Sequence, residues 1–209
     1  ERTTMANPIV INKPNIETVS FDVFGTQPMI QHKWSEKAKK QMLDKQMKKA
    51  TKGRDPKNPE QDFYDSLYLC SDGKHPKGPY GFPAVGFKSS AVRAAKQVEG
   101  MTMTDAKAWF YVIPDDGDLV RIYGPPPVIR EDMVKIQQTT DIRFRGQFNE
   151  WQVRLNVRYN KDQISSEQLL NLFELAGFSC GVGEWRMERG GTFGTFTLID
   201  PATELKKVA

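Results

Sequence analysis

A glycine-rich stretch near the C-terminus, residues 181–196, carries the residue types best suited to bind a chain of phosphates. It reads GVGEWRMERGGTFGTF and holds five glycines and two arginines between two runs with the pattern of strands. Glycine leaves no side chain above the backbone, so another chain can approach the main-chain N–H groups at Gly190 and Gly191. Arg186 and Arg189 flank that opening and can bind phosphates. A tight β-hairpin whose glycines serve only the turn is the alternative interpretation.

A lysine-rich segment, residues 33–54, holds nine basic residues against two acidic ones. Ser35 has the residue type of an N-cap, and apolar residues at helical spacing predict a helix that runs to about Ala50. The lysines on its other faces include Lys37, Lys40 and Lys48. Because few acids pair with them, we interpret this helix as a phosphate track that binds without regard to sequence and weakens with salt. An ordinary solvated face is the alternative.

The three residues immediately before the helix cap, His32, Lys33 and Trp34, combine a titratable ring, a cation and an aromatic ring. Trp34 can stack on a nucleobase, which contributes ~1–3 kcal/mol per base, or it can pack on its own helix as a hydrophobic staple. His32 can act as a general acid or base near neutral pH. The sequence therefore predicts binding residues here and leaves catalysis by His32 as the alternative.

Four arginines are expected on one face of a sheet. In the clearest strand pattern of the chain, Arg154 and Arg158 alternate with apolar residues, and Arg143 and Arg145 alternate in the same way in a short predicted strand. We expect two adjacent strands whose apolar face packs on helices and whose arginines line the open face. Guanidinium groups there can stack on bases and hydrogen-bond phosphates. An exposed polar sheet face without a ligand is the alternative.

A further anion site is predicted where Lys88, Ser89 and Ser90 precede an apolar helical pattern at residues 88–98. Ser89 or Ser90 has the type of an N-cap, and Arg93 lies one turn into the expected helix. Free N–H groups and the helix dipole favour anions at such a terminus. Arg93 as an ordinary surface residue is the alternative.

Motifs of the common enzyme classes are absent from the sequence, which contains no GxSxG, Walker, HExxH or CxxC pattern. Cys70 and Cys180 are too few and too far apart for a disulfide framework. With His32 and His75 they give no metal-ligand spacing. The acidic run at residues 115–118 has no glutamate at the spacing of a calcium loop. We therefore expect no metal, no cofactor, and a binding protein rather than an enzyme.

Composition indicates one globular domain. The chain has 209 residues, of which 38% are hydrophobic and 27% charged, and its formal net charge is +4. This balance suits a nucleic-acid partner without requiring one. No apolar run approaches the ~20 residues of a membrane span, and the first residues lack the basic start and apolar core of a signal peptide. We expect a cytoplasmic protein without a membrane partner.

The order of the predicted elements indicates an α+β domain of ferredoxin-like plan, β-α-β-β-α-β, with an antiparallel sheet and two helices on one face. Ser165 and Gln168 form a capping box for a helix to about Ala176, and Gly177 is expected to end it. Alternation predicts strands at residues 16–24, 108–113, 119–123 and 148–159, weak strands at 134–138 and 142–145, and a final hairpin of residues 178–186 and 193–199.

One domain is expected over residues 16–200, with an arm before it at residues 1–15 and a tail after it at residues 201–209. A helix-containing insertion is expected at about residues 52–105. Within it, residues 73–81 are rich in glycine and proline, which predicts a loop. Residues 28–30 are expected as a short continuation of the first strand.

Three segments resemble the RAMP superfamily, the ferredoxin-like proteins of CRISPR effector and crRNA-processing systems. They are residues 26–30 (TQPMI) after the first strand, residues 82–93 (FPAVGFKSSAVR) and residues 189–196 (RGGTFGTF). The resemblance implies a nucleic-acid-binding domain of which several copies line up along one strand, with CRISPR-type proteins as partners. Metal-independent RNA-processing members of that family use a histidine near the position of His32, so an endoribonuclease is the alternative that the resemblance implies.

The whole chain also resembles a group of bacteriophage proteins of similar length, which share residues 32–38 (HKWSEKA) and residues 183–186 (GEWR). This resemblance implies a phage-encoded protein, with phage replication or recombination proteins as further partners. It leaves open a protein that targets a host CRISPR complex. From the resemblances and the basic segments, we expect a protein that binds single-stranded DNA or RNA without strong sequence preference, as a homo-oligomer or filament.

Overall fold

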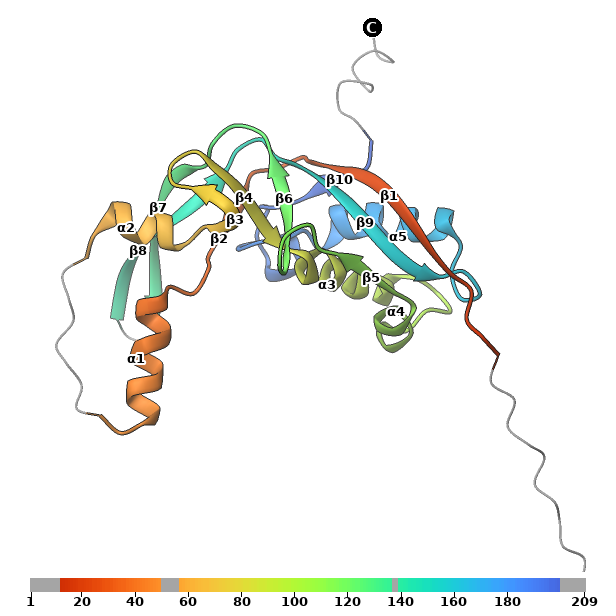
Figure 1. Ribbon diagram of the computed structural model, residues 1–209, viewed down its shortest axis with the longest axis horizontal. Helices are drawn as coiled ribbons and strands as arrows, with labels where there is room; N and C mark the ends of the chain where they lie inside the picture. The colour runs from red at the N-terminus through yellow and green to blue at the C-terminus, as the bar shows by residue number, and fades with distance from the viewer. Residues whose placement is uncertain (1–11, 50–56, 137–138, 200–209) are drawn as a thin grey trace, which may run out of the picture.

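The computed structural model describes residues 12–49, 57–136 and 139–199 and has an α+β architecture with antiparallel sheets, which confirms the predicted class. The expected tail and most of the expected arm lie outside the described residues. Figure 1 shows an arched molecule with two lobes. One lobe holds α3 (Ala84–Ala94), α4 (Met103–Trp109) and α5 (Ser166–Ser179); the other holds α1 (Glu36–Gln46), α2 (Pro59–Asp65), β7 (Val128–Ile136) and β8 (Thr139–Phe148).

The larger sheet has seven strands, in the order β10-β1-β9-β6-β4-β3, with β5 also paired to β9. The strand predicted at residues 16–24 is confirmed as β1, and the one predicted at residues 148–159 is confirmed as β9 only from Gln152 onward, because Phe148 ends β8. β1 and β9 pair antiparallel from Ile16 opposite Asn160 to Phe24 opposite Gln152. The bounds are β1 Ile16–Gly25, β3 Tyr68–Lys74, β4 Gly78–Pro83, β5 Phe110–Ile113, β6 Leu119–Tyr123, β9 Gln152–Asn160 and β10 Phe196–Thr197.

Helices α3 and α5 pack on one face of this sheet, beneath β1 and β9 in Figure 1. On β9 the residues that face them, Val153, Leu155 and Val157, are fully buried, whereas Arg154 and Arg158 point the other way and are exposed. Burial of each such apolar side chain contributes about 1.5–3 kcal/mol. The alternation of a strand therefore leaves the polar face of β9 open to solvent.

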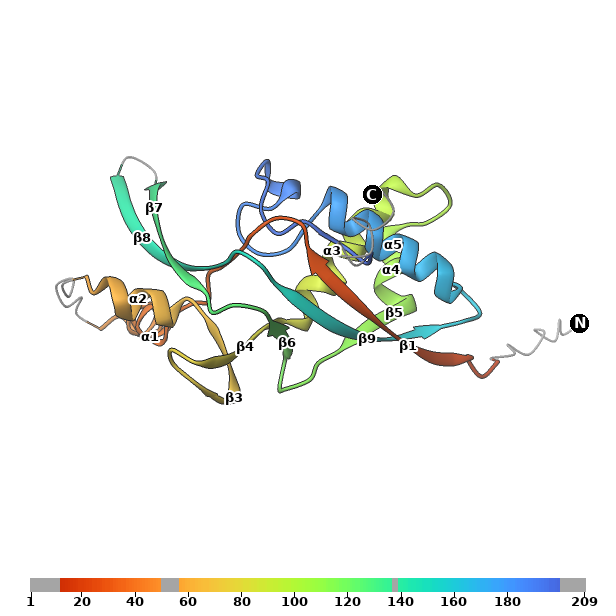
Figure 2. The ribbon, with the colours of Figure 1, turned by 90° about the horizontal axis from the view of Figure 1, so that it is seen from above.

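A smaller sheet, in the order β2-β8-β7, forms most of the second lobe, whose hairpin projects at one end of the molecule in Figure 2. Residues 28–30 were expected to continue the first strand, which is wrong. β2 (Met29–Gln31) turns away from β1 and pairs with β8 in the second sheet. α2 packs on β8. By contrast, the apolar side chains Met42, Leu43 and Met47 of α1 are exposed, so its predicted apolar stripe faces solvent.

One buried amide joins the two sheets. Gln31 at the end of β2 is fully buried; its Nε2 donates to the Gly81 carbonyl at 2.9 Å, and its Oε1 accepts from the Tyr68 N–H at 3.0 Å. Nearby, Ser66 Oγ accepts from the Gly146 N–H at 2.8 Å. Buried polar groups are costly to leave without a partner, so these bonds hold β3 and β4 in a fixed position relative to the second sheet.

The structure corrects the expected start of the helix at residues 88–98. α3 begins at Ala84, with Pro83 at the N-cap position, and the Ala84 N–H donates to the Asp118 carbonyl at 2.8 Å. Lys88 and Ser89 therefore lie one turn inside the helix and not at its terminus. The true terminus has no serine or aspartate cap, because a carbonyl from a distant loop takes that role.

The region expected as an insertion contributes two strands to the larger sheet. β3 and β4 pair antiparallel, and β4 also pairs with β6, so residues 73–81 form strand ends and a turn rather than a long loop. α4 was not predicted, although Thr102 and Asp105 form a capping box at its start.

The predicted C-terminal hairpin is wrong. α5 begins with the predicted capping box, but it continues through Gly177 and ends at Ser179. Gly177 does not stop the helix; its missing side chain leaves room for the Phe196 carbonyl. Residues 180–195 form a folded loop with a 3₁₀ turn at Met187–Arg189, and only the short strand β10 follows it.

Candidate binding groove

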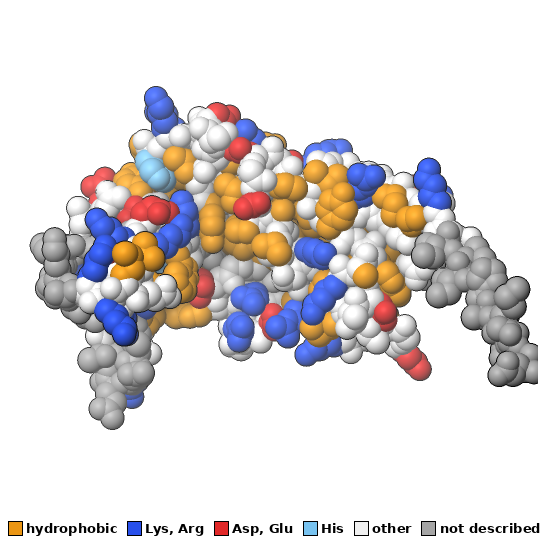
Figure 3. Space-filling model, turned by 60° about the horizontal axis from the view of Figure 1, so that its bottom comes forward, with side chains coloured by type: hydrophobic (Ala, Val, Ile, Leu, Met, Phe, Trp, Pro, Cys, Tyr) orange, Lys and Arg blue, Asp and Glu red, His pale blue; other side chains and the backbone are white. Residues whose placement is uncertain are grey.

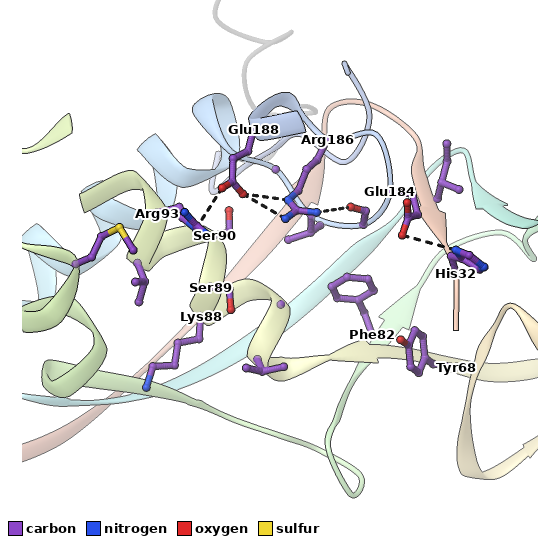
Figure 4. Close-up of a pocket in the computed structure, with 18 of the residues that line it drawn as sticks. His32, Tyr68, Phe82, Lys88, Ser89, Ser90, Arg93, Glu184, Arg186 and Glu188 are labelled. Atoms are coloured by element: carbon purple, nitrogen blue, oxygen red, sulfur yellow. Dashed lines mark hydrogen bonds and ion pairs between the residues drawn. The ribbon is translucent and has the colours of Figure 1, made fainter. Parts of the chain in front are cut away.

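Residues from three separately predicted sites line one cavity of about 630 Å³ between α3 and the loop that follows α5 (Figure 4). They are His32 after β2, Lys88, Ser89 and Arg93 on α3, and Arg186 in the loop. These positions are far apart in the sequence and come together only because β2 and the loop both pack beside α3. The cavity therefore combines predicted residues that no single motif joins.

Two more cavities adjoin the first. One, of about 400 Å³, lies between the β2–α1 connection and β8, contains Trp34 in its wall, and shares His32 with the first cavity. The other, of about 780 Å³, lies beside the start of α3 and shares lining residues with both neighbours. The residues that it shares are Lys33, Tyr68, Val85 and Lys88. We call the three cavities together the central groove.

Glu188 neutralises part of the positive charge in the central groove. One of its carboxylate oxygens lies 3.2 Å from Arg93 Nε and the other lies 3.2 Å from Arg186 Nη2 (Figure 4). Arg186 Nη1 also donates to the Gly183 carbonyl at 3.1 Å. One carboxylate shared by two arginines leaves a net positive charge, and a guanidinium has five N–H donors. Donors therefore remain for an anionic ligand.

Three lysines that line the groove, Lys33, Lys88 and Lys107, form no ion pair with an acidic side chain in the described part of the chain. Lysine ion pairs in the described part of the chain do not include Lys33 or Lys88; they involve Lys39, Lys49, Lys57 and Lys161. Lys88 Nζ donates to the Lys107 carbonyl at 2.9 Å, which uses one of its three N–H donors. Lys33 lies where the second and third cavities meet. Both side chains can therefore bind an anion directly.

His32 lies at the junction of the first two cavities, with Nδ1 3.8 Å from Glu184 Oε1. Burial lowers the pKa of His32 below the ordinary histidine value; the positive charges of Arg145 and Arg143 lower it further, and Glu184 opposes them. The imidazole is therefore neutral at pH 7. A neutral ring offers one nitrogen as a donor and the other as an acceptor.

We expect the stability of the protein to fall more steeply between about pH 7 and pH 5 than that of a His32→Gln variant. Because the folded-state pKa of His32 is lowered, the unfolded chain binds the proton more readily. The stability from neutral His32 is complete above the ordinary histidine pKa and is lost as the pH falls through the folded value. Urea unfolding at several pH values measures the difference.

His75→Gln is the matched variant for that experiment, because His75 is the other histidine of the chain and burial also lowers its pKa. The two variants separate the contributions of the two rings. Identical pH profiles for wild type and His32→Gln would contradict the burial of His32 in the groove wall.

The lining of the groove includes the aromatic rings of Trp34, Tyr68, Phe82, Tyr111 and Phe144. The Trp34 side chain is 56% exposed, so much of its surface is free to contact a ligand. Tyr68, the first residue of β3, was not predicted as a site residue. Its ring contacts Phe82 edge-on, with centroids 6.3 Å apart. Burial and Glu184 raise the pKa of Tyr68, so its hydroxyl stays protonated and can donate a hydrogen bond.

The prediction that Arg143 and Arg145 share a surface with Arg154 and Arg158 is wrong. β8 pairs with β7 and β2, whereas β9 pairs with β1, β5 and β6, so the two pairs of arginines lie in different sheets. Arg145 is buried, with Nη1 3.3 Å from Asp132 Oδ2, and cannot contact a ligand. Arg143 lines the second cavity of the groove.

Arg154 and Arg158 form a separate surface on the open face of the larger sheet. Arg154 Nη1 lies 3.4 Å from Asp22 Oδ1, which neutralises part of its charge. Arg158 lies opposite Tyr111 of β5, whose side chain is 47% exposed. Arg154 and Arg158 line none of the three cavities, but Tyr111 lines the third, so this surface borders the central groove there.

The glycine-rich loop is closed by its own chain, which contradicts the expected free main-chain N–H groups. The Gly191 N–H donates to the Arg186 carbonyl at 3.2 Å, and the Gly194 N–H donates to the Pro28 carbonyl at 2.8 Å. A side chain at Gly191 would collide with the Trp185 carbonyl. The glycines here permit the loop to pack on itself rather than on a ligand.

Gly190 differs from its neighbour, because a Cβ there would meet no atom within 4 Å, although its φ is +77°. Arg189, Gly190 and Gly191 are absent from the linings of the three cavities. Of the site residues predicted in this loop, the structure therefore brings only Arg186 into the central groove.

The lysines of α1 flank the second cavity, whose lining includes Ala38 and Met42. Lys40 and Lys48 are exposed, as predicted, whereas the side chain of Lys37 lies outside the described residues. Figure 3 shows Lys and Arg side chains in both lobes, with hydrophobic side chains between them. The described lysines of α1 therefore lie beside the second cavity and do not line it.

Among the described residues, no group of three or more His, Cys, Asp or Glu side chains could hold a metal ion. The acidic turn is occupied by its own chain: Asp115 accepts from the Arg121 N–H at 2.9 Å, and Asp116 accepts from the Ser71 N–H at 2.5 Å. Cys70 and Cys180 are buried free thiols. No described helix is long and apolar enough to cross a membrane.

Fold and groove together define an α+β protein with a cleft lined by aromatic rings and by equal numbers of cationic and acidic side chains. No family model and no curated protein matches the chain. Chains of known structure do match, among them a crystal structure of Cmr6 from Pyrococcus furiosus. That match has 8% sequence identity and a TM-score of 0.43, and it covers 88% of this chain and 98% of the other.

Proposed function

We propose that the protein binds single-stranded nucleic acid in the central groove without strong sequence preference. One observation carries the proposal: three adjoining cavities combine Lys33 and Lys88, which form no ion pair with a described acidic side chain, with the exposed ring of Trp34. Cations that track a backbone, together with aromatic rings on which bases stack, are the common features of proteins that bind single strands. Single strands are favoured over duplex because a paired base cannot stack on Trp34.

The chemistry of each contact follows from its donor groups. Lys33, Lys88 and the partly neutralised Arg93 and Arg186 can neutralise backbone phosphates, which carries no sequence information. Stacking on Trp34 is also tolerant of sequence, because every base has a π-face. The open sheet face with Arg154 and Arg158 offers a second basic surface. Charge reversal of these two arginines tests whether nucleic acid binds there.

We also propose that the larger sheet follows the ferredoxin-like plan of the RAMP superfamily. Support comes from the strand order, in which β1 and β9 are neighbours, β10 lies beside β1 and β5 lies beside β9. Further support comes from α3 and α5, which pack on the same face of these strands. Phage origin, cytoplasmic location and assembly of copies along a strand stay predictions from the sequence.

The test of the binding proposal is a titration of the full chain with single-stranded DNA, single-stranded RNA and duplex DNA at several salt concentrations. The slope of log K against log salt is about −0.7 for each phosphate neutralised on a single strand. We expect tighter binding of a single strand than of the duplex and a slope that corresponds to several phosphates. Equal binding of duplex and single strand, or no dependence on salt, would overturn the proposal.

Replacement of Trp34 by alanine is expected to weaken binding of a single strand about fivefold, near the lower end of the ~1–3 kcal/mol that a stacked base contributes. Trp34→Phe is the matched variant and should retain most of the affinity. Because Trp34 is 56% exposed, neither change should lower the melting temperature much. Fluorescence anisotropy with a labelled oligonucleotide measures the affinities, and equal values for all three proteins would exclude stacking on Trp34.

A metal-independent endoribonuclease is the second candidate, favoured by the neutral state of His32 in the groove wall. A neutral imidazole can accept the proton of a ribose 2′-hydroxyl while the 2′-oxygen attacks the adjacent phosphate. This forms a 2′,3′-cyclic phosphate and breaks the bond to the 5′-oxygen of the next nucleotide, which takes up a proton from water. Cleavage of a labelled hairpin RNA in EDTA, lost in His32→Ala but kept in His75→Gln, would establish this activity. If wild type leaves the RNA intact under conditions where it binds, the protein is a binding protein alone.

A further inference from the structure

β7 is an edge strand whose outer side has no partner among the described residues. It pairs with β8 along its whole length, and β8 pairs with β2 on its other side, so β7 ends the sheet. Its hairpin projects away from the rest of the molecule in Figure 2. Proteins commonly shorten, bend or cover such edges, because unpaired N–H and C=O groups invite another strand. A nine-residue edge is therefore a site where a partner strand can add.

The two faces of β7 differ in a way that leaves one available. Asp132 is buried against Arg145 and Arg130. Its neighbours on the opposite face, Glu131 and Met133, point to solvent, and Met133 is 75% exposed. A partner strand added at this edge would cover the exposed side chain of Met133.

The charges on this exposed face are self-complementary. Glu131 and Lys135 lie two positions before and after Met133, and because side chains alternate, all three share one face. If two copies pair antiparallel about a two-fold axis through Met133, Glu131 of each copy lies opposite Lys135 of the other. A shift of two residues in either direction places Met133 opposite one of the charged residues and loses both ion pairs. One register is therefore preferred over its neighbours.

We propose that β7 binds β7 of a second copy of this chain, antiparallel over residues 131–135, and forms a closed two-fold dimer. The partner strand is that of a second copy, because two β7 edges place opposite charges, Glu131 and Lys135, against each other and place Met133 against Met133. An interface of this kind uses the same surface on both copies and does not propagate. The dimer does not depend on nucleic acid, and Glu131, Met133 and Lys135 line none of the three cavities of the groove.

The test is the mass of the full chain without nucleic acid, measured by sedimentation equilibrium over a range of concentrations. Wild type is expected to approach twice the chain mass of 23.8 kDa. Glu131→Lys and Lys135→Glu should each raise the dimer dissociation constant about tenfold, because like charges would then face each other. The double variant Glu131→Lys with Lys135→Glu restores opposite charges and should dimerise like wild type.

Lys77→Glu, an exposed lysine in the β3–β4 turn, is the control for a change in net charge and should leave the dimer unchanged. Circular dichroism checks that each variant is folded. A monomer at every concentration, a mass that grows beyond two copies, or a double variant as weak as the single ones would overturn the β7 dimer. Nucleic-acid binding measured on the same variants tests the groove independently, so a failure of the dimer proposal can be told apart from a failure of the binding proposal.

Discussion

Reversal of the charges of Lys33 and Lys88 together, to glutamate, is expected to weaken binding of a single-stranded oligonucleotide about 25-fold at roughly 0.1 M salt. Each phosphate contact on a single strand contributes about 0.7 to the salt slope. Loss of two contacts therefore removes about 1.4 from the slope of log K against log salt. Over the tenfold change from roughly 1 M to 0.1 M salt, this difference in slope amounts to about a 25-fold difference in affinity. Both lysines line the groove and form no ion pair with a described acidic side chain, so each can neutralise a phosphate.

The control for this experiment is Lys74→Glu with Lys77→Glu, which changes the net charge by the same amount. Both lysines are exposed and lie outside the linings of the three cavities. Their effect should be small, because charges distant from the ligand are screened within about 8–10 Å at physiological salt.

A second comparison, Arg154→Glu with Arg158→Glu, decides between the groove and the open sheet face. If the groove is the binding site, this variant should bind nearly as wild type does and keep the wild-type salt slope. If instead it loses more affinity than the Lys33 and Lys88 variant, the strand lies on the open face and the groove proposal is wrong.

Gly194→Ala is expected to destabilise the folded protein by about 3 kcal/mol or more, as core disruptions of the severe kind do. The φ of Gly194 is +66°, where a side chain is strained, and a Cβ would overlap the Val182 carbonyl. That carbonyl cannot move easily, because Val182 and Gly194 are also joined by a main-chain hydrogen bond of 2.9 Å. Urea unfolding measures the free energy of unfolding of the two proteins.

Gly190→Ala is the matched control, because its φ is also positive but a Cβ there would meet open space. It should cost only the ~1–2 kcal/mol of a left-handed backbone with a side chain. The difference in the free energy of unfolding between the two variants measures the cost of the close contact between residue 194 and the Val182 carbonyl. Equal losses of stability would mean that the loop does not pack on itself as described.

Elements whose signals are local could be predicted from the sequence. Ser35 and Ser165 cap α1 and α5 with their own side chains, so the residue type alone marks the start of each helix. The alternation in β1 and β9 also needs no partner to be visible, because one face is buried and the other is not. Lys88, Ser89 and Arg93 were predicted at a helix N-terminus, which is wrong, because α3 begins at Ala84; they line the groove from inside the helix.

The rest depended on contacts between distant segments, which a single sequence does not encode locally. The arginines of β8 and β9 have the same pattern, yet pairing places them in different sheets, and Asp132 on another strand buries Arg145. The glycines of residues 181–194 have the composition of a ligand-binding loop. In the structure, the carbonyls of Trp185 and Val182 fill the space above Gly191 and Gly194, so these glycines allow the loop to pack on itself.

Gln31 has a consequence for the length of polymer that the protein can cover. Its two side-chain hydrogen bonds fix β3 and β4 against the second sheet, and the groove runs across the junction that they hold. The distance between the outermost contacts is then a property of the folded chain and not of the ligand. Nuclease protection would accordingly give a footprint of constant size, the same for DNA and RNA and unchanged by salt, even where affinity differs.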